Sequence, residues 1–200
     1  MQTKSLLLSC LLGLGAAGAF SQNAVSETQV VAKDALPIGR LEAKTMSHEE
    51  LMRLAIDLSV QNVRNGGGPF GAVIARNGKI VAVGTNRVTP DCDPTAHAEI
   101  SAIRAAAKKL GTFDLSGCDI YTSCEPCPMC LGAIYWAHLE RMYYGNSKED
   151  AARIGFDDAF IYEELDLKPA DRRLKSQELL PEEAIKAFRD WEKKSDKVEY

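Results

Sequence analysis

Two short segments that carry histidine, cysteine and glutamate constrain this chain more than any other feature of its sequence. The first reads Pro-Thr-Ala-His-Ala-Glu over residues 94–99, and the second reads Cys-Glu-Pro-Cys-Pro-Met-Cys over residues 124–130. Each segment opens a predicted helix, because helical spacing or a helix-starting proline follows it. If these side chains act as one group, the fold must bring two helix starts together.

The residue types in the two segments predict a metal site. Taken singly, His97 reads as a polar residue at a helix end, Glu99 as a solvated first-turn carboxylate, and the Cys-x-x-Cys pair as a redox pair or a disulfide. Together they supply one nitrogen, two sulfurs and one unattached carboxylate. Three protein ligands with a fourth position open is the arrangement of catalytic zinc, whereas a structural site closes with a fourth protein ligand.

Three cysteines compete for the two sulfur positions. Proline is favoured as the first residue of a helix, so Pro128 places Cys127 at the N-cap and Cys130 at the third helical position. Both thiolates then face the same point in front of the helix, where the helix dipole favours negative charge. Cys124 lies a turn earlier and is interpreted as a small buried hydrophobe. We therefore predict Zn2+ bound by His97, Cys127 and Cys130.

The remaining pattern predicts a layered α/β domain. Ser47 and Glu50 form a capping box before an amphipathic run, and Asn77-Gly78 is a two-residue hairpin signal between two strands. Alternating strands and helices imply crossover connections. The expected elements are a helix over 48–64, strands over 70–76 and 79–85, a loop over 86–94, a helix closed by Gly111, a strand over 119–123, a helix over 128–137, a strand over 141–144 and a helix around 181–194.

The first residues do not read as part of the fold. Residues 1–21 have the order of a secretory signal peptide: a lysine, an uncharged apolar run and then small residues. The run is shorter than the roughly 20 residues of a membrane span. The alternatives to a signal peptide are an N-terminal anchor and a buried core helix. Residues 22–45 are expected to be a linker and 46–200 the domain. The mature chain is thus expected to be exported, periplasmic or secreted, without a stable membrane span.

Composition narrows the classes of partner. The 200 residues are 46% hydrophobic and 26% charged, as in ordinary globular proteins, and 24 basic residues against 28 acidic ones leave a net charge of −4. A nucleic-acid partner is disfavoured, since such binders usually carry a strong basic balance or stripe. Six cysteines at uneven spacing are too few for a disulfide scaffold.

The motifs resemble a known family. His97-Ala-Glu99 with Pro126-Cys-Pro-Met-Cys130 resembles the zinc-dependent cytidine-deaminase-like superfamily. Further segments resemble the bacterial guanine deaminases within it, and the similarity covers nearly all of 46–200. These segments are Gly68–Ile74, Asp93–Glu99, Thr122–Trp136, Gly155–Tyr162 and the final Glu199-Tyr200.

The resemblance implies a fold, a reaction and a set of site residues. It implies a three-layer α/β/α fold with a central five-stranded mixed sheet, zinc at His97, Cys127 and Cys130, and Glu99 as proton shuttle in the conversion of guanine to xanthine and ammonia. It also implies a homodimer in which a swapped C-terminal segment closes the partner's site. The residues that it places against a purine substrate are Asn86, Asp158 and Tyr200. Three aromatic residues could either stack on the base or fill the core: Phe70, Trp136 and Phe156.

Other functions fit parts of the pattern. The same zinc signature serves deaminases of other small nucleobases or nucleosides, such as guanosine or cytosine, and tRNA adenosine deaminases. The acidic charge and the export signal argue against the tRNA enzyme. A non-enzymatic alternative is an exported zinc-binding interaction module, against which Glu99 argues, because a structural metal site needs no unligated carboxylate.

Overall fold

The computed structural model describes residues 36 and 38–199. The expected signal peptide, most of the expected linker and Tyr200 lie outside the described residues. Within the described part, no helix is long and apolar enough to cross a membrane.

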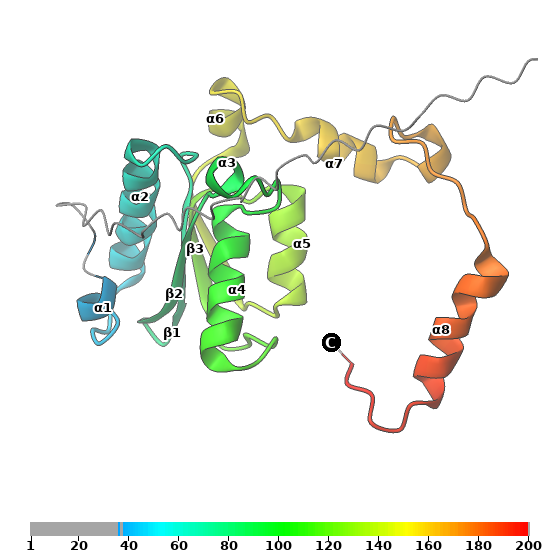
Figure 1. The fold of residues 1–200 in the computed structure, drawn as a ribbon. Helices are drawn as coiled ribbons and strands as arrows, with labels where there is room; N and C mark the ends of the chain where they lie inside the picture. The colour runs from blue at the N-terminus through cyan, green and yellow to red at the C-terminus, as the bar shows by residue number, and fades with distance from the viewer. Residues whose placement is uncertain (1–35, 37, 200) are drawn as a thin grey trace, which may run out of the picture. The chain divides into compact units, whose positions relative to one another are not determined.

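A small mixed sheet forms the middle layer (Figure 1). Its strands are β1 (Gly71–Arg76), β2 (Lys79–Thr85), β3 (Asp119–Cys124) and β4 (Arg141–Asn146), in the spatial order β2-β1-β3-β4. β1 pairs antiparallel with both β2 and β3, and β3 pairs parallel with β4. The Asn77-Gly78 hairpin is confirmed: both residues have positive φ, 52° and 75°, as a tight two-residue turn between twisted strands requires.

Helices cover both faces of the sheet, so the predicted three layers are confirmed (Figure 1). Alternate residues of β1 face opposite sides. Val73 and Ala75 pack with α2 (His48–Arg64), while Ala72 and Ile74 pack with α4 (Ala98–Leu110) and α5 (Pro128–Trp136). The predicted capping box at Ser47 and Glu50 starts α2, and Gly111 ends α4 in the left-handed conformation.

The sheet has four strands in the described part of the chain, not the expected five. The reason is local. Ser147 follows β4 directly and makes a capping box with Asp150, which starts helix α6 (Lys148–Arg153) instead of returning the chain to the sheet. Two further helices and a 3-10 turn follow: α7 (Ala159–Asp166), η1 (Pro169–Asp171) and α8 (Pro181–Lys193).

Two segments differ from the expected irregular connections. The expected loop 86–94 contains a short helix, α3 (Val88–Asp91). Part of the expected linker 22–45 packs on the domain through α1 (Ile38–Leu41), because Leu36, Ile38 and Leu41 contact the apolar cluster under α2. The folded unit thus includes residues before 46, and it begins at Leu36.

Gly84 generates a stability prediction, because β2 and α4 touch there backbone to backbone. An added Cβ would lie 2.5 Å from the Ala102 nitrogen and closer still to the Ala98 carbonyl oxygen. Overpacking typically costs roughly 1–3 kcal/mol, and backbone yields less than a side chain. We expect Gly84→Ala to lower the free energy of unfolding by about 3 kcal/mol, measured by urea denaturation.

Gly132 offers the matched control. It lies within α5, and an added Cβ meets nothing within 4 Å. Gly132→Ala should therefore raise stability by about 0.5–1 kcal/mol through helix propensity. Equal stability of the two variants would contradict the packing argument.

Candidate metal centre

Two helix starts meet at one point in front of the sheet. His97 is the N-cap of α4 and Cys127 is the N-cap of α5, with nearly the same extended backbone (φ −68°, ψ 161° and φ −64°, ψ 167°). Neither side chain caps its own helix. Because α4 and α5 lie on the same face of the sheet and contact each other, the two N-cap side chains turn toward one another.

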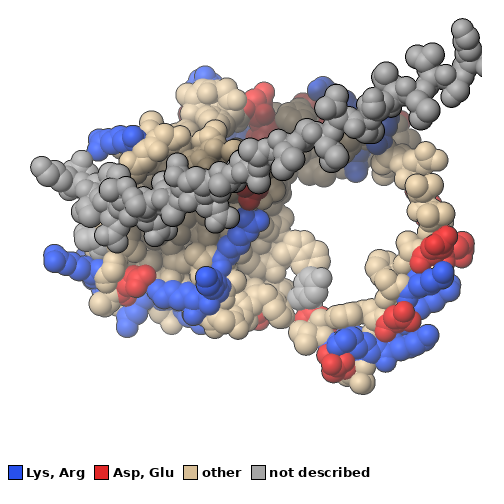
Figure 2. Space-filling model, viewed as in Figure 1, with Lys and Arg blue, Asp and Glu red and all other residues tan. Residues whose placement is uncertain are grey.

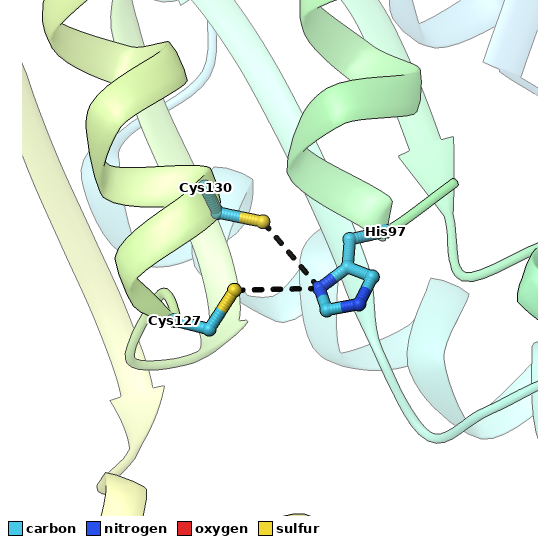
Figure 3. Close-up of side chains that lie close together, drawn as sticks. All are labelled: His97, Cys127 and Cys130. Carbon is cyan, nitrogen blue, oxygen red and sulfur yellow. Dashed lines mark hydrogen bonds between the residues drawn. The ribbon is translucent and has the colours of Figure 1, made fainter. Parts of the chain in front are cut away.

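The three predicted ligands are brought together (Figure 3). Cys127 Sγ and Cys130 Sγ each lie 3.5 Å from His97 Nδ1. The ligand atoms of all three residues lie within 4.8 Å of one another. Tetrahedral zinc with Zn–S near 2.3 Å and Zn–N near 2.0–2.1 Å gives a nitrogen-to-sulfur distance of about 3.5 Å. The donor set and its spacing therefore fit Zn2+.

Cys124 has a different environment. Its side chain is buried, and its thiol lies 3.5 Å from the Ser147 carbonyl oxygen, to which it donates. Burial raises the pKa of Cys124 to about 11, and the nearby Glu99 charge adds to this. A thiol that resists ionisation and already has a partner is a poor metal ligand.

The electrostatics of the two remaining thiols favour a cation between them. Hydrogen bonds from Cys130 and then His97 lower the pKa of Cys127 to about 4. The same pairing, together with burial, raises the pKa of Cys130, because a second thiolate beside the first is repelled. Both sulfurs can be anionic at once only beside positive charge, and a coordinated divalent metal deprotonates such thiols outright.

Glu99 follows His97 by two residues and lies beside the Cys130 thiol. It is the second residue of α4 and is only 6% exposed, although carboxylates are rarely buried without a charged partner. Burial raises the pKa of Glu99, and the charge of Cys127 raises it further. A buried acid that is not a metal ligand is a candidate for proton transfer.

A cleft of about 490 Å³ opens over these groups. It contains three of the predicted substrate residues beside His97, Glu99 and Cys127: Phe70, Asn86 and Asp158. Phe70 packs edge-on against Phe156, with ring centroids 5.0 Å apart, so one wall is aromatic. Phe156 was part of the resemblance to guanine deaminases, but the sequence alone did not separate a stacking role from a packing role.

Asp158 lies at the start of α7 with its side chain available. Its side chain makes no cap bond to the helix; instead the neighbouring Asp157 accepts a hydrogen bond from Ala159 N at 3.0 Å. Burial and the charge of Cys127 raise the pKa of Asp158. Asp157 thus accepts the hydrogen bond at the start of α7, and Asp158 lines the cleft.

The structure does not bring Trp136 to the cleft. It is the last residue of α5 and is 65% exposed, whereas the ligands lie at the other end of that helix. Eight residues at 1.5 Å each separate it from Pro128 by about 12 Å. A helix places its two ends apart, so an aromatic there neither stacks on a base in this cleft nor fills the core.

The sequence analysis missed several polar residues of the cleft, Glu125 and Lys148 among them. Glu125 accepts a hydrogen bond from Lys148 N at 3.2 Å, and Lys148 Nζ lies 5.0 Å from the centre of the Tyr162 ring. Glu125 was visible as the residue between Cys124 and Pro126 in the cysteine segment. Lys148 gave no signal, because its place depends on how α6 follows β4.

Comparison with known proteins agrees with this geometry. The family model for the cytidine and deoxycytidylate deaminase zinc-binding region matches residues 45–146. The chain belongs to this family of zinc-binding deaminases. The structure positions His97, Cys127 and Cys130 to hold a metal ion, as a zinc-binding deaminase domain requires.

Relatives differ in how much of the chain they match. Guanine deaminase of Bacillus subtilis is 48% identical over 78% of this chain and 100% of its own length, and its crystal structure aligns over 78% and 99% with a TM-score of 0.75. A guanine deaminase structure from Nitrosomonas europaea is 34% identical over 62% and 75%, with a TM-score of 0.57. A tRNA-specific adenosine deaminase of Agrobacterium fabrum is 47% identical over only 38% of this chain and 51% of its own length.

The ligand assignment in this deaminase domain can be tested by metal content. We expect Cys127→Ser and Cys130→Ser to lose most bound zinc, because each removes a thiolate from the group of three. Cys124→Ser should retain about one zinc per chain, since its thiol bonds the Ser147 carbonyl instead. Elemental analysis of the purified proteins measures this, and zinc loss confined to Cys124→Ser would overturn the assignment.

Proposed function

We propose that this chain hydrolyses guanine to xanthine and ammonia. One observation carries the proposal: a single cleft is lined by two of the three candidate metal ligands, His97 and Cys127, together with the buried Glu99 and the polar side chains Asn86 and Asp158. Similarity to guanine deaminase over the whole length of the Bacillus subtilis enzyme supports guanine as the substrate. In the reaction, water adds its oxygen to the amino-bearing carbon C2, the C2–N bond breaks, and ammonia leaves.

The chain's own groups provide binding and proton transfer. Zinc in such a site supplies Lewis-acid activation of water. Glu99 takes a proton from the attacking water, holds it at a carboxylate oxygen, delivers it to a ring nitrogen and then assists departure of the amine. Its burial keeps it beside the reacting carbon and away from bulk solvent.

Two side chains orient the base in this mechanism. Asp158 accepts hydrogen bonds from the N–H edge of the purine, and Asn86 contacts another polar edge from the end of β2. Asn86 is itself fixed, because its Oδ1 accepts from Val88 N at 3.3 Å. The edge-on pair of Phe70 and Phe156 supplies an apolar wall for the ring.

Replacement of Glu99 tests the chemical step. Glu99→Gln keeps the size of the side chain and its burial but removes the titrating oxygen. We expect zinc content and the folded state to be retained while kcat for guanine falls by about 10²–10⁴-fold, the usual contribution of a positioned acid or base. Near-normal turnover of Glu99→Gln would refute the proton-transfer role. A wild-type protein that turned over no substrate would instead favour the zinc-binding interaction module.

Substrate choice tests Asp158. The wild-type protein should release ammonia from guanine far faster than from guanosine, adenine, adenosine, cytosine or cytidine. Asp158→Ala should lower kcat/KM for guanine by about 10²-fold or more without loss of zinc, because alanine cannot accept hydrogen bonds from the N–H edge of the purine. Glu163→Gln, an exposed change on α7, is the control. Equal wild-type rates on guanine and adenine would contradict the role.

We also propose a homodimer in which the C-terminal segment of each chain completes the partner's site. Helix α5 has no charged residue, yet Tyr135 and Trp136 are 74% and 65% exposed. Helix α8 buries none of its residues, and its apolar side chains Ile185, Phe188 and Trp191 share one side at helical spacing. Acidic and basic side chains are interspersed along the rest of α8 (Figure 2). Uncovered apolar faces of this kind support association with a second copy.

Charges placed on the apolar side of α8 test the dimer. The wild-type protein should sediment as a dimer, and the double variant Phe188→Asp, Trp191→Asp should sediment as a monomer. The double variant should also turn over guanine more slowly while it retains zinc. Lys186→Asp changes charge on the opposite side of α8 and should leave the dimer intact. Deletion of 198–200 should keep both dimer and zinc but sharply lower turnover if Tyr200 closes over the base. A fully active monomer would overturn the proposal.

A further inference from the structure

Asn62 joins two parts of the cleft wall without lining the cleft itself. It lies near the end of α2 and is 9% exposed. Its Nδ2 donates to the Gly68 carbonyl oxygen at 2.7 Å and to the Asn86 carbonyl oxygen at 2.8 Å. Gly68 and Asn86 both line the cleft, although they belong to different segments.

The chemistry of these bonds restricts which side chain can make them. Both partners are carbonyl oxygens, so the atom that faces them must be the amide nitrogen and not the amide oxygen. The two N–H groups are used in two directions at once. A hydroxyl has a single donor and a carboxylate has none, so neither serine nor aspartate could hold both carbonyls.

Glycines make room for the side-chain amides of Asn62 and Asn86. A Cβ on Gly67 would lie 2.7 Å from Asn62 Cγ and closer still to Nδ2, and a Cβ on Gly68 would lie 3.0 Å from Asn86 Cγ. Gly67 has no positive φ, so its lack of a side chain serves this close approach. Gly67 N also donates to the Asn62 carbonyl oxygen at 2.9 Å.

Main-chain bonds extend the link to the aromatic wall. Phe70 N donates to the Gly68 carbonyl oxygen at 2.8 Å, and Asn86 N donates to the Phe70 carbonyl oxygen at 3.1 Å. Asn62, Gly68, Phe70 and Asn86 therefore form one hydrogen-bonded ring. Because the ring contains Asn86 and Phe70, a shift of any member would move both a polar and an apolar side chain of the cleft.

We infer that Asn62 is a positioning residue that sets where Asn86 and Phe70 stand relative to the bound base. It acts through these two residues, whereas the metal ligands and Glu99 belong to the starts of α4 and α5. Its loss should therefore weaken substrate binding and leave the chemical step largely intact. The kinetic part of this inference rests on the proposed function.

Truncation of Asn62 is the first arm of the test. Asn62→Ala in the zinc-loaded protein should raise KM for guanine, and the Kd for the analogue 8-azaguanine by calorimetry, by about tenfold, because small misplacements in a site are costly. The kcat should change less than about threefold and zinc content should not change. Ser59→Ala is the matched control: Ser59 is a buried polar residue of the same helix whose hydroxyl bonds within α2, to the Ile56 carbonyl at 2.7 Å.

Gly67→Ala is the second arm, which disturbs the same amide from outside. The added methyl should displace the Asn62 side chain and raise KM and Kd by a similar factor. In the Asn62→Ala background the methyl has room, so Gly67→Ala should then change KM by less than about twofold, a non-additivity expected only of coupled groups. Additive effects, or unchanged KM and Kd in either single variant, would overturn the inference.

Amide hydrogen exchange separates this inference from the proposed substrate. In both single variants the Phe70 and Asn86 amides should exchange faster than in the wild type, with no substrate present. Faster exchange without any guanine turnover or 8-azaguanine binding by the wild type would reject the proposed function while retaining the ring. Unchanged exchange in both variants, or faster exchange with unaltered KM in an active enzyme, would reject Asn62 as a positioning residue.

Discussion

The backbone contact between α4 and β2 at Gly84 holds the metal centre in place. It seats α4 against the sheet at the Ala98 turn, one residue after His97 and one before Glu99. Because α5 rests on the same face, the depth of α4 decides whether the His97 nitrogen meets the two sulfurs. Two helix N-termini then point their N–H groups at one place, and the positive ends of their dipoles favour a thiolate at Cys127, whose pKa is lowered to about 4.

Local chemistry made the ligands and the main elements predictable from sequence. Pro128 fixed the start of α5 and hence the direction of Cys127, and Asn77-Gly78 fixed the hairpin that carries Asn86 at its end. Each of these signals depends on a few neighbouring residues. Features that depend on tertiary placement were not predictable: Trp136 shares a helix with the ligands yet lies at its far end, and Lys148 enters the cleft only because a cap at Ser147 turns the chain after β4.

The two adjacent carboxylates at the start of α7 show how hydrogen bonding divides roles. Asp157 is occupied by the Ala159 amide, so the turn is satisfied without Asp158. Asp158 therefore remains available to a ligand. Burial raises the pKa of Asp158, so a hydrogen-bond donor on the ligand would stabilise its ionised form. Residue type alone cannot distinguish two adjacent aspartates. The hydrogen bond from the Ala159 main-chain amide to Asp157 does distinguish them.

The open side of β4 has a consequence for the isolated chain. Among the described strands β4 pairs only with β3, so its other edge presents unpaired main-chain donors and acceptors beside the exposed Tyr144. Such an edge is a template for strand addition by any extended chain, including an unfolded copy of itself. Its brevity and Arg141 at its first position limit that recruitment. A chain in which nothing covers this edge is consequently the form of the protein most prone to coaggregate.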